Sequence, residues 1–497
     1  MSARATEPTG RGGAAFGAKR VLARTIGVAS RRSGRGGGTT LPGRVLLRME
    51  PEAIARLGAR LTGGATIVSA TNGKTTTAGM IAAILAAEGR RAVHNRAGSN
   101  MTWGVATALL EQRGTEGLFE VDEAWLPRVA EQLEPKLIVL GNLFRDQLDR
   151  YGEMETLAEE WAKAVDAAPA GTGLALNADD PLIADLGRDP DTERPRDGVL
   201  YFGIEDHSQA LPELQHAFDA KHCRRCGHPY AYEMAFVGHL GHYSCPNCGA
   251  QRPRPEVAAT RIELRGMEGS AATVRVPGGE IEIQLPLPGL YNVYNALAAI
   301  SAALKLGVEA ERVAAALAGM RAAFGRVETI PVGDKSVSIL LIKNPAGANE
   351  VLRTLKLEAE RPLPGVSSQK SSDSDANCEL TGRAADDGGQ IDLWIALNDR
   401  IADGRDVSWV WDADFEVLTG AVRRVTCAGT RAPEMALRLK YAGWPEDSIV
   451  VEPDIATSLD AAVAASPGRI FALPTYTALL ELRKLLADRG LAREFWR

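Results

Sequence analysis

The residues best suited to chemistry lie in a short loop between a predicted strand and a predicted helix. An apolar, β-branched run at 65–70 precedes the loop, and a helix-periodic run at 78–85 follows it. Such a loop directs backbone N–H groups, the positive end of a helix dipole and a lysine charge to one point, and it offers a hydroxyl group to Mg²⁺. The pattern predicts a site for the phosphates of a nucleoside triphosphate. Its residues are Thr71, Asn72, Gly73, Lys74, Thr75, Thr76 and Thr77.

The loop departs from the strict phosphate-loop motif at one position. The motif has a glycine five residues before Gly73, where this chain has Val68. The alternative interpretation is therefore an ordinary glycine-containing turn.

Four cysteines form a second candidate site, this one for a metal. They stand in two Cys-x-x-Cys pairs separated by eighteen residues, which is the spacing of a zinc site. Gly227 and Gly249 follow the pairs where each needs a tight turn, so both pairs can direct their thiolates to one ion. A full set of four sulfur ligands leaves no open position, so the pattern predicts structural rather than catalytic zinc. The predicted ligands are Cys223, Cys226, Cys245 and Cys248.

Other interpretations of the cysteines stay open. Disulfides are disfavoured in a cytosolic protein, and unbound thiols are a further alternative. A zinc ribbon can also bind nucleic acid, but residues 221–255 are only modestly basic, so a structural insertion is favoured. Nearby histidines are interpreted as surface residues and the remaining cysteines as incidental; these are His222, His228, His239, His242, Cys378 and Cys427.

A third polar group follows an apolar strand predicted at 391–397. Open α/β sheets place their ligand sites at the carboxyl ends of the strands, and this group of aspartates falls there. Capping and turn formation are the alternative roles. The group consists of Asp399, Asp403, Asp406 and Asp412.

Alternating strands and helices must position these groups. Between about 45 and 330, strands predicted at 67–70, 117–121, 137–140 and 174–176 each precede a predicted helix. This alternation predicts a mostly parallel sheet with helices on both faces. The cysteine segment, at about 218–255, interrupts it. Strands at 260–264, 272–276 and 281–285 then indicate a small antiparallel part, followed by helices at 294–306 and 310–324.

The alternation restarts after residue 326 and predicts a second, smaller, Rossmann-like α/β domain. Residues 359–390 interrupt it with a Ser-, Asp-, Gly- and Pro-rich run without periodicity, which indicates a flexible surface insertion. The predicted organisation is a basic Gly/Arg-rich arm at 1–44, a central nucleotide-binding domain at 45–328 and a C-terminal domain at 329–497. The strands of the C-terminal domain are predicted at 337–342, 391–397, 424–427, 449–451 and 470–472, and its helices at 348–357, 433–442, 456–465 and 475–488.

Charge and hydropathy narrow the functional classes. A net charge of −6 over 497 residues argues against a nucleic-acid binder, and no apolar run is long enough to span a membrane, so we expect a cytoplasmic protein. Residues 1–60 hold twelve Lys and Arg against three acidic residues. We expect residues 1–40 to be disordered or loosely attached. The more specific alternative is that this basic region is attracted to an anionic membrane or an anionic substrate.

Five ordered motifs, spread over about 260 residues, resemble the Mur ligase superfamily, ATP-dependent enzymes that build the peptide of peptidoglycan. Mur-type phosphate loops also lack the early glycine. The other motifs are Asn-Leu-Phe-Arg-Asp-Gln-Leu-Asp-Arg-Tyr-Gly at 142–152, Asn-Ala-Asp-Asp-Pro at 177–181, Gly-Leu-Tyr-Asn-Val-Tyr-Asn at 289–295 and Gly-Arg-Val-Glu at 325–328.

The resemblance implies roles for individual residues. Lys74 contacts the β- and γ-phosphates of ATP, and Thr75 binds magnesium together with a second carboxylate, either Glu123, which we prefer, or Glu120. A solvated acidic loop is the alternative for both glutamates. Asn292 or Asn295 reaches the adenine, and Arg326 reaches the nucleotide from the hinge between the domains. For Asn295, a helix N-terminal cap is an equally simple explanation.

A narrower resemblance extends from about residue 37 onward. The chain lacks the large N-terminal UDP-binding domain, carries the four-cysteine insertion, and has the segments 343–350 and 402–409, as in the ligase subunits of lipid II isoglutaminyl synthases. This implies ATP-dependent amidation of the D-glutamate α-carboxyl in the lipid II stem peptide, giving D-isoglutamine. It also implies a partner, the glutaminase subunit GatD, which releases ammonia from glutamine. A carboxylate of this chain orients the histidine of that glutaminase; we favour Asp406, with Asp403 second.

Two positions depart from the wider Mur pattern. Gln147 replaces a histidine that is a metal-ligand candidate, and Trp161 and Ala162 stand where amino-acid-adding members carry a carbamylated lysine, with Lys163 just beyond. The alternative functions are a free-standing Mur-type ligase that adds an amino acid, which these departures disfavour, and a zinc-ribbon ATPase acting on nucleic acid.

Overall fold

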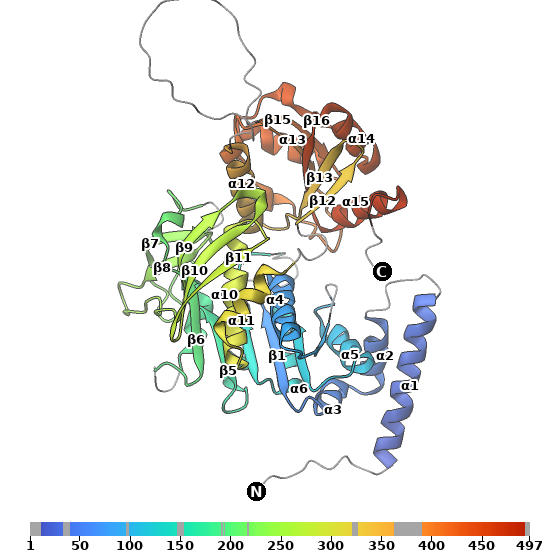
Figure 1. The fold of residues 1–497 in the computed structure, drawn as a ribbon, viewed down its shortest axis with the longest axis vertical. Coiled ribbons are helices and arrows are strands. Elements are labelled where there is room, and N and C mark those ends of the chain that lie inside the picture. The colour runs from blue at the N-terminus through green and yellow to red at the C-terminus, as the bar shows by residue number, and fades with distance from the viewer. Residues whose placement is uncertain are drawn as a thin grey trace, which may run out of the picture.

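The computed structural model describes residues 11–32, 40–95, 99–146, 154–189, 192, 194–215, 218–320, 327–361 and 390–492. Two large sheets organise these residues, one of nine strands and one of six. Figure 1 shows the six-stranded sheet above the nine-stranded one, with the phosphate-loop helix α4 (Lys74–Ala87) rising toward it. Within the described residues, no helix is both long and apolar enough to cross a bilayer.

The nine-stranded sheet has the order β11-β10-β9-β6-β5-β4-β1-β3-β2. Strands β1 to β6 and β9 run parallel, and β10 and β11 add the predicted antiparallel part at one edge of the same sheet. Strand β1 is almost wholly buried, as a central parallel strand covered on both faces must be. The strands are β1 (Gly64–Ser69), β2 (Ala92–His94), β3 (Glu116–Glu120), β4 (Leu137–Leu140), β5 (Gly173–Asn177), β6 (Val199–Ile204), β9 (Val257–Leu264), β10 (Ser270–Val276) and β11 (Gly279–Leu285).

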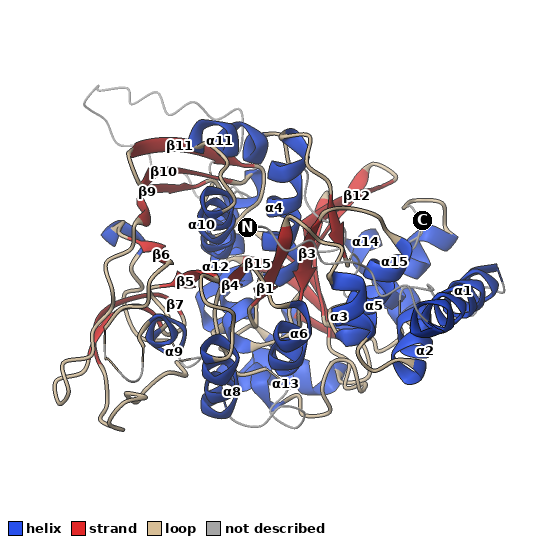
Figure 2. Ribbon diagram, turned by 90° about the horizontal axis from the view of Figure 1, so that it is seen from below, coloured by secondary structure: helices blue, strands red, loops and turns tan. Residues whose placement is uncertain are grey.

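Helices cover both faces of this sheet and enclose two apolar cores. One core lies under α4, α10 (Leu290–Lys305) and α11 (Ala310–Ala318). The view in Figure 2 shows α4 and α10 on one side of the strands and α6 and α8 on the other. The helices that close the second core are α1 (Arg11–Arg32), α2 (Leu41–Met49), α3 (Ala53–Gly58), α5 (Thr102–Glu111), α6 (Leu126–Leu133), α8 (Met154–Asp166) and α9 (Pro181–Ala184).

The six-stranded sheet has the order β12-β13-β17-β14-β15-β16 and is parallel except for β12. Two further apolar cores lie on its two faces. The predicted insertion at 359–390 lies almost entirely outside the described residues, as does Cys378. The elements are β12 (Val327–Val332), β13 (Lys335–Leu340), α12 (Pro345–Ala359), β14 (Ile391–Ala396), β15 (Val422–Ala428), α13 (Ala432–Tyr441), β16 (Ile449–Val451), α14 (Ile455–Ala465), β17 (Arg469–Pro474) and α15 (Tyr476–Asp488).

The expectation of a disordered N-terminal region is wrong for part of it. Residues 11–32 form one helix, α1 (Arg11–Arg32), which packs beside α2 and α5. Phe16 and Ala23 are buried, and Lys19, Arg24 and Arg31 bind the body of the protein through Glu50, the Leu110 carbonyl and Glu111. The Gly- and Arg-rich composition suggested disorder, but the basic side chains bind the rest of the protein and hold the helix in place. Residues 1–10 and 33–39 lie outside the described residues.

The segment between β6 and β9 leaves the sheet and forms a small module. Strands β7 (Ala231–Val237) and β8 (Leu240–Ser244) pair as an antiparallel hairpin, with one Cys-x-x-Cys pair before β7 and the other after β8. This is the four-cysteine insertion that the spacing predicted.

Candidate functional site

The phosphate loop connects β1 to α4 at the carboxyl edge of the nine-stranded sheet. Gly73 is the N-cap of α4 and has a φ of 92°, a conformation that favours glycine. A Cβ atom at this position would stand 1.9 Å from Oδ1 of Asn295, so the loop also needs glycine for space. The chain after β1 goes to one side of that strand and later returns to the other as β4, which places the loop at a topological switch point.

Lys74 is the buried cation of this loop. Its Nζ lies 2.7 Å from Oε2 of Glu123 and also donates to the Ala70 carbonyl. Burial opposes its charge, but the nearby carboxylates of Glu123, Asp122 and Glu120 outweigh burial and raise the pKa of Lys74. Lys74 is therefore a fixed positive charge at the start of α4.

Three acidic residues face Lys74 from the end of β3 and the loop after it. Burial favours a neutral Glu123, but Lys74 and Lys343 outweigh it and lower the pKa of that carboxyl. Burial and the charge of Glu123 raise the pKa of Asp122, a residue that the sequence analysis missed. Glu120 and Glu123 are buried, which excludes the solvated acidic loop offered as their alternative. Carboxylates and the Thr75 hydroxyl are the hard oxygen ligands that Mg²⁺ prefers, so this donor set fits magnesium.

The C-terminal domain closes over the phosphate loop through two residues that follow β13. Nζ of Lys343 lies 2.5 Å from Oδ2 of Asp146 and 3.0 Å from the Thr71 carbonyl. The side-chain amides of Asn344 and Asn72 exchange two hydrogen bonds, at 3.1 and 3.2 Å. Lys343 and Asn344 belong to the segment 343–350, for which no role was predicted. Their place at the end of a parallel strand was the available signal.

A cleft extends from the loop between the two domains and encloses about 930 Å³, its open mouth included. Asn72, Gly73 and Thr76 lie at the phosphate end, together with Asn292 and Asn295 of α10. The other walls are mostly apolar, and they come from both domains and from the cysteine module. They include Phe144, Val237, Leu240, Tyr291 and Val351.

Asn295 joins α10 to the phosphate loop. Its Oδ1 accepts from Oγ1 of Thr77 at 3.3 Å, and its Nδ2 donates to Oδ1 of Asn292 at 3.0 Å. Helix α10 begins at Leu290 with Gly289 as its N-cap, so the helix-cap alternative for Asn295 is wrong. Arg326, the predicted hinge contact, lies outside the described residues.

The structure describes one of the two places where the chain departs from the Mur pattern. Trp161 is fully buried, and its Nε1 donates to the Glu123 carbonyl at 2.8 Å. Lys163 points away, with 70% of its side chain exposed and an ion pair to Glu160, so it has no part in this site. Gln147 lies outside the described residues.

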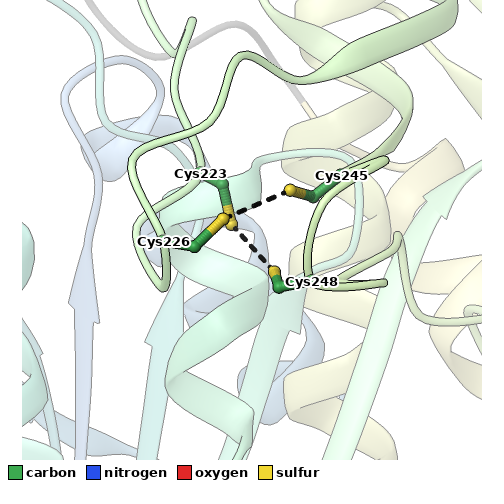
Figure 3. Close-up of side chains that lie close together, drawn as sticks. All are labelled: Cys223, Cys226, Cys245 and Cys248. Carbon is green, nitrogen blue, oxygen red and sulfur yellow. Dashed lines mark hydrogen bonds between the residues drawn. The ribbon is translucent and has the colours of Figure 1, made fainter.

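The four cysteines converge on one point, as Figure 3 shows. Their sulfur atoms all lie within 4.8 Å of one another, with Cys223 to Cys248 at 3.6 Å and Cys226 to Cys245 at 3.5 Å. A tetrahedral site with Zn–S bonds of about 2.3 Å separates its sulfurs by about 3.8 Å, whereas a disulfide needs about 2.05 Å. The geometry fits zinc and excludes the disulfide alternative in this structure.

The turns around the cysteines are the tight ones that were expected. Gly227 and Gly249 have φ values of 71° and 74°, and each N–H donates to the carbonyl of the first cysteine of its pair. One histidine differs from expectation: His239 is not a surface residue but is fully buried. His242 binds the Ile204 carbonyl through Nε2, and Cys427 is a buried free thiol.

The aspartates after β14 differ in whether their carboxylates bind other parts of the protein. Asp399 binds Arg431, and Asp412 lies 3.3 Å from Nη1 of Arg145. Asp403 turns inward and accepts from both the N–H and the hydroxyl of Thr477 at the start of α15. Asp406 is exposed and caps its own turn, accepting from the Ser408 N–H at 2.8 Å. An open recess beside the group is lined by Asp399, Arg400, Ile401, Ala402, Arg405, Arg431 and Thr477.

Comparison with known proteins covers nearly the whole chain. A family model for the Mur ligase middle domain matches residues 68–248 and 243–303, and one for the MurT ligase C-terminal region matches residues 377–479. The chain is 32% identical over 485 residues to the lipid II isoglutaminyl synthase (glutamine-hydrolyzing) subunit MurT of Streptococcus pneumoniae, covering 95% of this chain and 99% of the relative. The same subunit of Staphylococcus aureus is 30% identical over 470 residues, covering 94% and 96%.

Solved structures share the fold at lower identity. A pseudomurein peptide ligase type C from Methanothermus fervidus superimposes with a TM-score of 0.63 at 22% identity, covering 88% of this chain and 80% of that one. MurF from Acinetobacter baumannii gives 0.60 at 17% identity, covering 91% and 79%. With the relatives matched over almost their full length, the chain belongs to the MurT family and has the Mur ligase fold.

Proposed function

We propose that this chain is the ligase subunit of a lipid II isoglutaminyl synthase, which amidates the D-glutamate α-carboxyl of the lipid II stem peptide to D-isoglutamine. The observation that carries the proposal is the buried Lys74–Glu123 pair at a phosphate loop whose Gly73 lines the interdomain cleft, in a chain that matches MurT subunits end to end. This amidation is a step in peptidoglycan biosynthesis.

The chemical problem defines what the site must do. A carboxylate does not react with ammonia at neutral pH, because it is a poor electrophile. Transfer of the γ-phosphoryl group of ATP to the carboxylate gives an acyl phosphate, and ammonia then displaces phosphate to form the amide. The protein must therefore hold two anions together and neutralise the charge on the migrating phosphoryl group.

Lys74 and the loop backbone supply the first part of that neutralisation. Lys74 contacts the β- and γ-phosphates, the N–H groups at the start of α4 donate to phosphate oxygens, and Gly73 lets the backbone approach them. Magnesium would supply further neutralisation of the phosphate charge, and Thr75 with Glu123 or Glu120 would hold it. Because Glu123 pairs with Lys74 in this structure, binding of nucleotide and metal requires that pair to separate or to share its charges.

Lys343 supplies a second cation from the C-terminal domain. It reaches the phosphate loop at the Thr71 carbonyl, and it is held there by Asp146. Because it lies on the other domain, its charge arrives at the γ-phosphate only when the cleft is closed. Closure would thus couple phosphoryl transfer to the exclusion of water.

The acceptor side of the site is consistent with a small nucleophile. The position where amino-acid-adding relatives carry a carbamylated lysine holds Trp161, which is buried against the Glu123 carbonyl. Lys163 cannot substitute, because it points to solvent. Ammonia needs no second recognition site, so a glutaminase subunit that releases it nearby is sufficient.

The partner of this chain in the proposal is the glutaminase GatD. A cysteine–histidine glutaminase needs an acid to orient its histidine. Asp406 is exposed, and its carboxylate accepts a hydrogen bond from Ser408 within its own turn. Asp403, by contrast, is buried and accepts from Thr477. Asp406 is therefore the proposed contribution to the partner, and the recess beside it is the proposed contact region.

Reconstitution tests the proposal. The purified chain is incubated with ATP, magnesium, lipid II and ammonium chloride, and the amidated product is measured by mass spectrometry. We expect product with ammonium chloride alone, and with glutamine only after GatD is added. Absence of phosphate release under all of these conditions would refute the proposal. Amide formation with a free amino acid but not with ammonia would instead identify an amino-acid-adding ligase.

A further inference from the structure

We propose that the hairpin of the four-cysteine module is a nucleotide-positioning element. Residues 237–240 at its tip form one wall of the cleft and brace the segment 142–146 against the phosphate loop, so that a metal on the cysteines sets the affinity for nucleotide. This inference rests on the proposed function, because it takes the cleft as the nucleotide site.

The tip of the hairpin is buried, which is unusual for a tight turn. Val237 pairs with Leu240, leaving Gly238 and His239 as a two-residue loop with Gly238 at a φ of 53°. Loops of this kind normally lie on the surface. Here Phe236 and His239 are fully buried, so the hairpin is inserted into the central domain.

The inserted tip touches the cleft directly. Val237 and Leu240 line it, and the His239 ring lies 4.8 Å from the ring of Phe144, which lines it as well. Nε2 of His239 is 3.4 Å from Oδ2 of Asp180, the carboxylate that also receives the Leu143 N–H. The tip therefore supports both an apolar wall and the segment that carries Phe144.

That segment is in turn bonded to the phosphate loop. The Phe144 N–H donates to Oγ1 of Thr71 at 3.1 Å, and Asn142 exchanges two hydrogen bonds with the backbone of Asn72. On the other side, Arg145 is held by Asp219, four residues before Cys223. The segment 142–146 is thus fixed between the phosphate loop and the cysteine module.

The hairpin also contacts the C-terminal domain. Arg353 of α12 donates to the Phe236 carbonyl at 3.2 Å and to the Gln209 carbonyl at 3.1 Å. The module is consequently in contact with both walls of the cleft.

The base of the hairpin depends on the cysteines. Ser244, the last residue of β8, directly precedes Cys245, and the apolar cluster around the sulfurs is small, with Cys223, Cys245, Ala250 and Tyr230. The β-ladder joins Ala231 to Ser244, and the rings of Tyr230 and Tyr243 lie 5.1 Å apart. Beyond these contacts the apolar cluster contributes little by itself, and a metal would add the bonds that connect the two Cys-x-x-Cys loops. Losing it would loosen the hairpin at its base and, through the tip, the wall of the cleft.

Nucleotide affinity tests the inference. ADP with magnesium is titrated calorimetrically into the full chain carrying one equivalent of zinc, and into the variant Val237→Ala/Leu240→Ala. That variant keeps all four cysteines, so its zinc content should be unchanged, while ADP should bind about tenfold more weakly because apolar wall contacts are lost. Glu233→Ala, an exposed residue of the same hairpin, is the matched control and should bind ADP as the parent does.

A second measurement isolates the role of the metal. Chelation of zinc, or Cys226→Ser/Cys248→Ser, should weaken ADP binding and should speed hydrogen exchange at the amides of Leu143, Phe144 and Arg145. Unchanged ADP affinity in the zinc-loaded tip variant, or unchanged exchange at 142–146 after zinc removal, would overturn the inference while leaving the proposed function standing. Failure of the parent protein to bind ADP would overturn the proposed function and this inference with it.

Discussion

At the scale of single residues, Lys74 is both buried and positively charged. In the proposed function it binds phosphate as a cation, yet it is buried, and the nearby carboxylates outweigh burial and raise its pKa. Glu123 is buried as well, and in the proposed function it must be ionised to bind a metal; Lys74 and Lys343 lower its pKa. The pair thus keeps both residues charged, and in the proposed function the nucleotide and its metal would replace it as partners. A buried ion pair of this kind adds little net stability but prepares the site electrostatically.

Lys74→Ala should therefore abolish amidation with ammonia as well as with glutamine. We expect a loss of at least about 100-fold in kcat, because the phosphoryl group loses its fixed cation. The variant also leaves Glu123 as an unpaired buried carboxylate, so its thermal stability is measured in parallel. Lys163→Ala, at an exposed lysine, is the control. Retention of normal ammonia-dependent activity by a folded Lys74→Ala protein would contradict the assignment.

Asp406 and Asp403 should behave in opposite ways when each is changed to Asn. Asp406→Asn should keep the ammonia-dependent rate and lose most of the glutamine-dependent rate with GatD, since the change removes a charge offered to the partner. Asp403→Asn should instead lower stability by about 1 kcal/mol, because it weakens the bonds to Thr477. Both rates and the urea midpoint are compared. If Asp403→Asn is the selective variant, the choice of Asp406 is wrong.

Glu350 gives the protein a pH dependence of stability. Burial raises the pKa of its carboxyl to about 7, and neither oxygen has a partner of good hydrogen-bond geometry, although Arg353 and the N–H groups of Tyr291 and Leu290 favour ionisation. The unfolded chain releases this proton near 4.5, so stability should fall as pH rises from about 4.5 to about 7 and stay level above.

Glu350→Gln should remove that dependence. At pH 8 the variant should be more stable than the parent by up to about 3 kcal/mol, whereas at pH 4.5 the two should be alike. Urea unfolding between these pH values, followed by tryptophan fluorescence, makes the comparison. Glu360→Gln, just after the end of α12, is the control. An equal pH dependence in parent and Glu350→Gln proteins would show that Glu350 ionises normally.

At the scale of elements, α1 is held by charges rather than by a broad apolar face. Arg24 donates to the Leu110 carbonyl in the last turn of α5, where the helix dipole is negative and the carbonyls lack helical partners. We expect Arg24→Ala to raise the hydrogen-exchange rate of α1 and of the last turn of α5 without affecting the phosphate loop. Arg32→Ala, at the exposed end of α1, should leave exchange unchanged. Equal exchange in all three proteins would mean that α1 does not depend on this contact.

The sequence predicts most elements because their signals are local. The buried run of β1 and the alternation of strands with helices determine the sheets, and the cysteine spacing determines the hairpin module. The sequence predicted that α10 starts at residue 294, whereas it starts at Leu290, because Gly289, at a φ of 88°, caps it before the periodic apolar run begins. Asn295 therefore lies inside the helix and is not its cap. Local patterns also cannot show that a two-residue turn such as Gly238–His239 is buried, because its contacts lie far away in the chain.

At the scale of the whole molecule, the cleft is made by contacts that span the sequence. Lys343 and Asp146 are 197 residues apart, and Asn344 and Asn72 are 272 apart. No pattern of charge or hydropathy encodes such pairs, although both members of each pair follow strands whose carboxyl ends meet at the cleft. The phosphate loop, the second cation and the apolar wall thus come from three parts of the chain that only the tertiary fold brings together.

Lys343→Met tests whether the second cation acts in catalysis. The substitution keeps most of the side-chain length but removes the bonds to Asp146 and the Thr71 carbonyl. We expect kcat with ammonia to fall by about 10- to 100-fold, because one charge at the phosphoryl group is lost, while the melting temperature changes little. Lys356→Met, on the surface of α12, should have neither effect. Asn344→Ala removes the amide pair and the N-cap bond to the Gly347 N–H but no charge, so it should raise the KM for ATP more than it lowers kcat. If Lys343→Met instead matches Asn344→Ala in both parameters, Lys343 holds the domains together but does not stabilise the transition state.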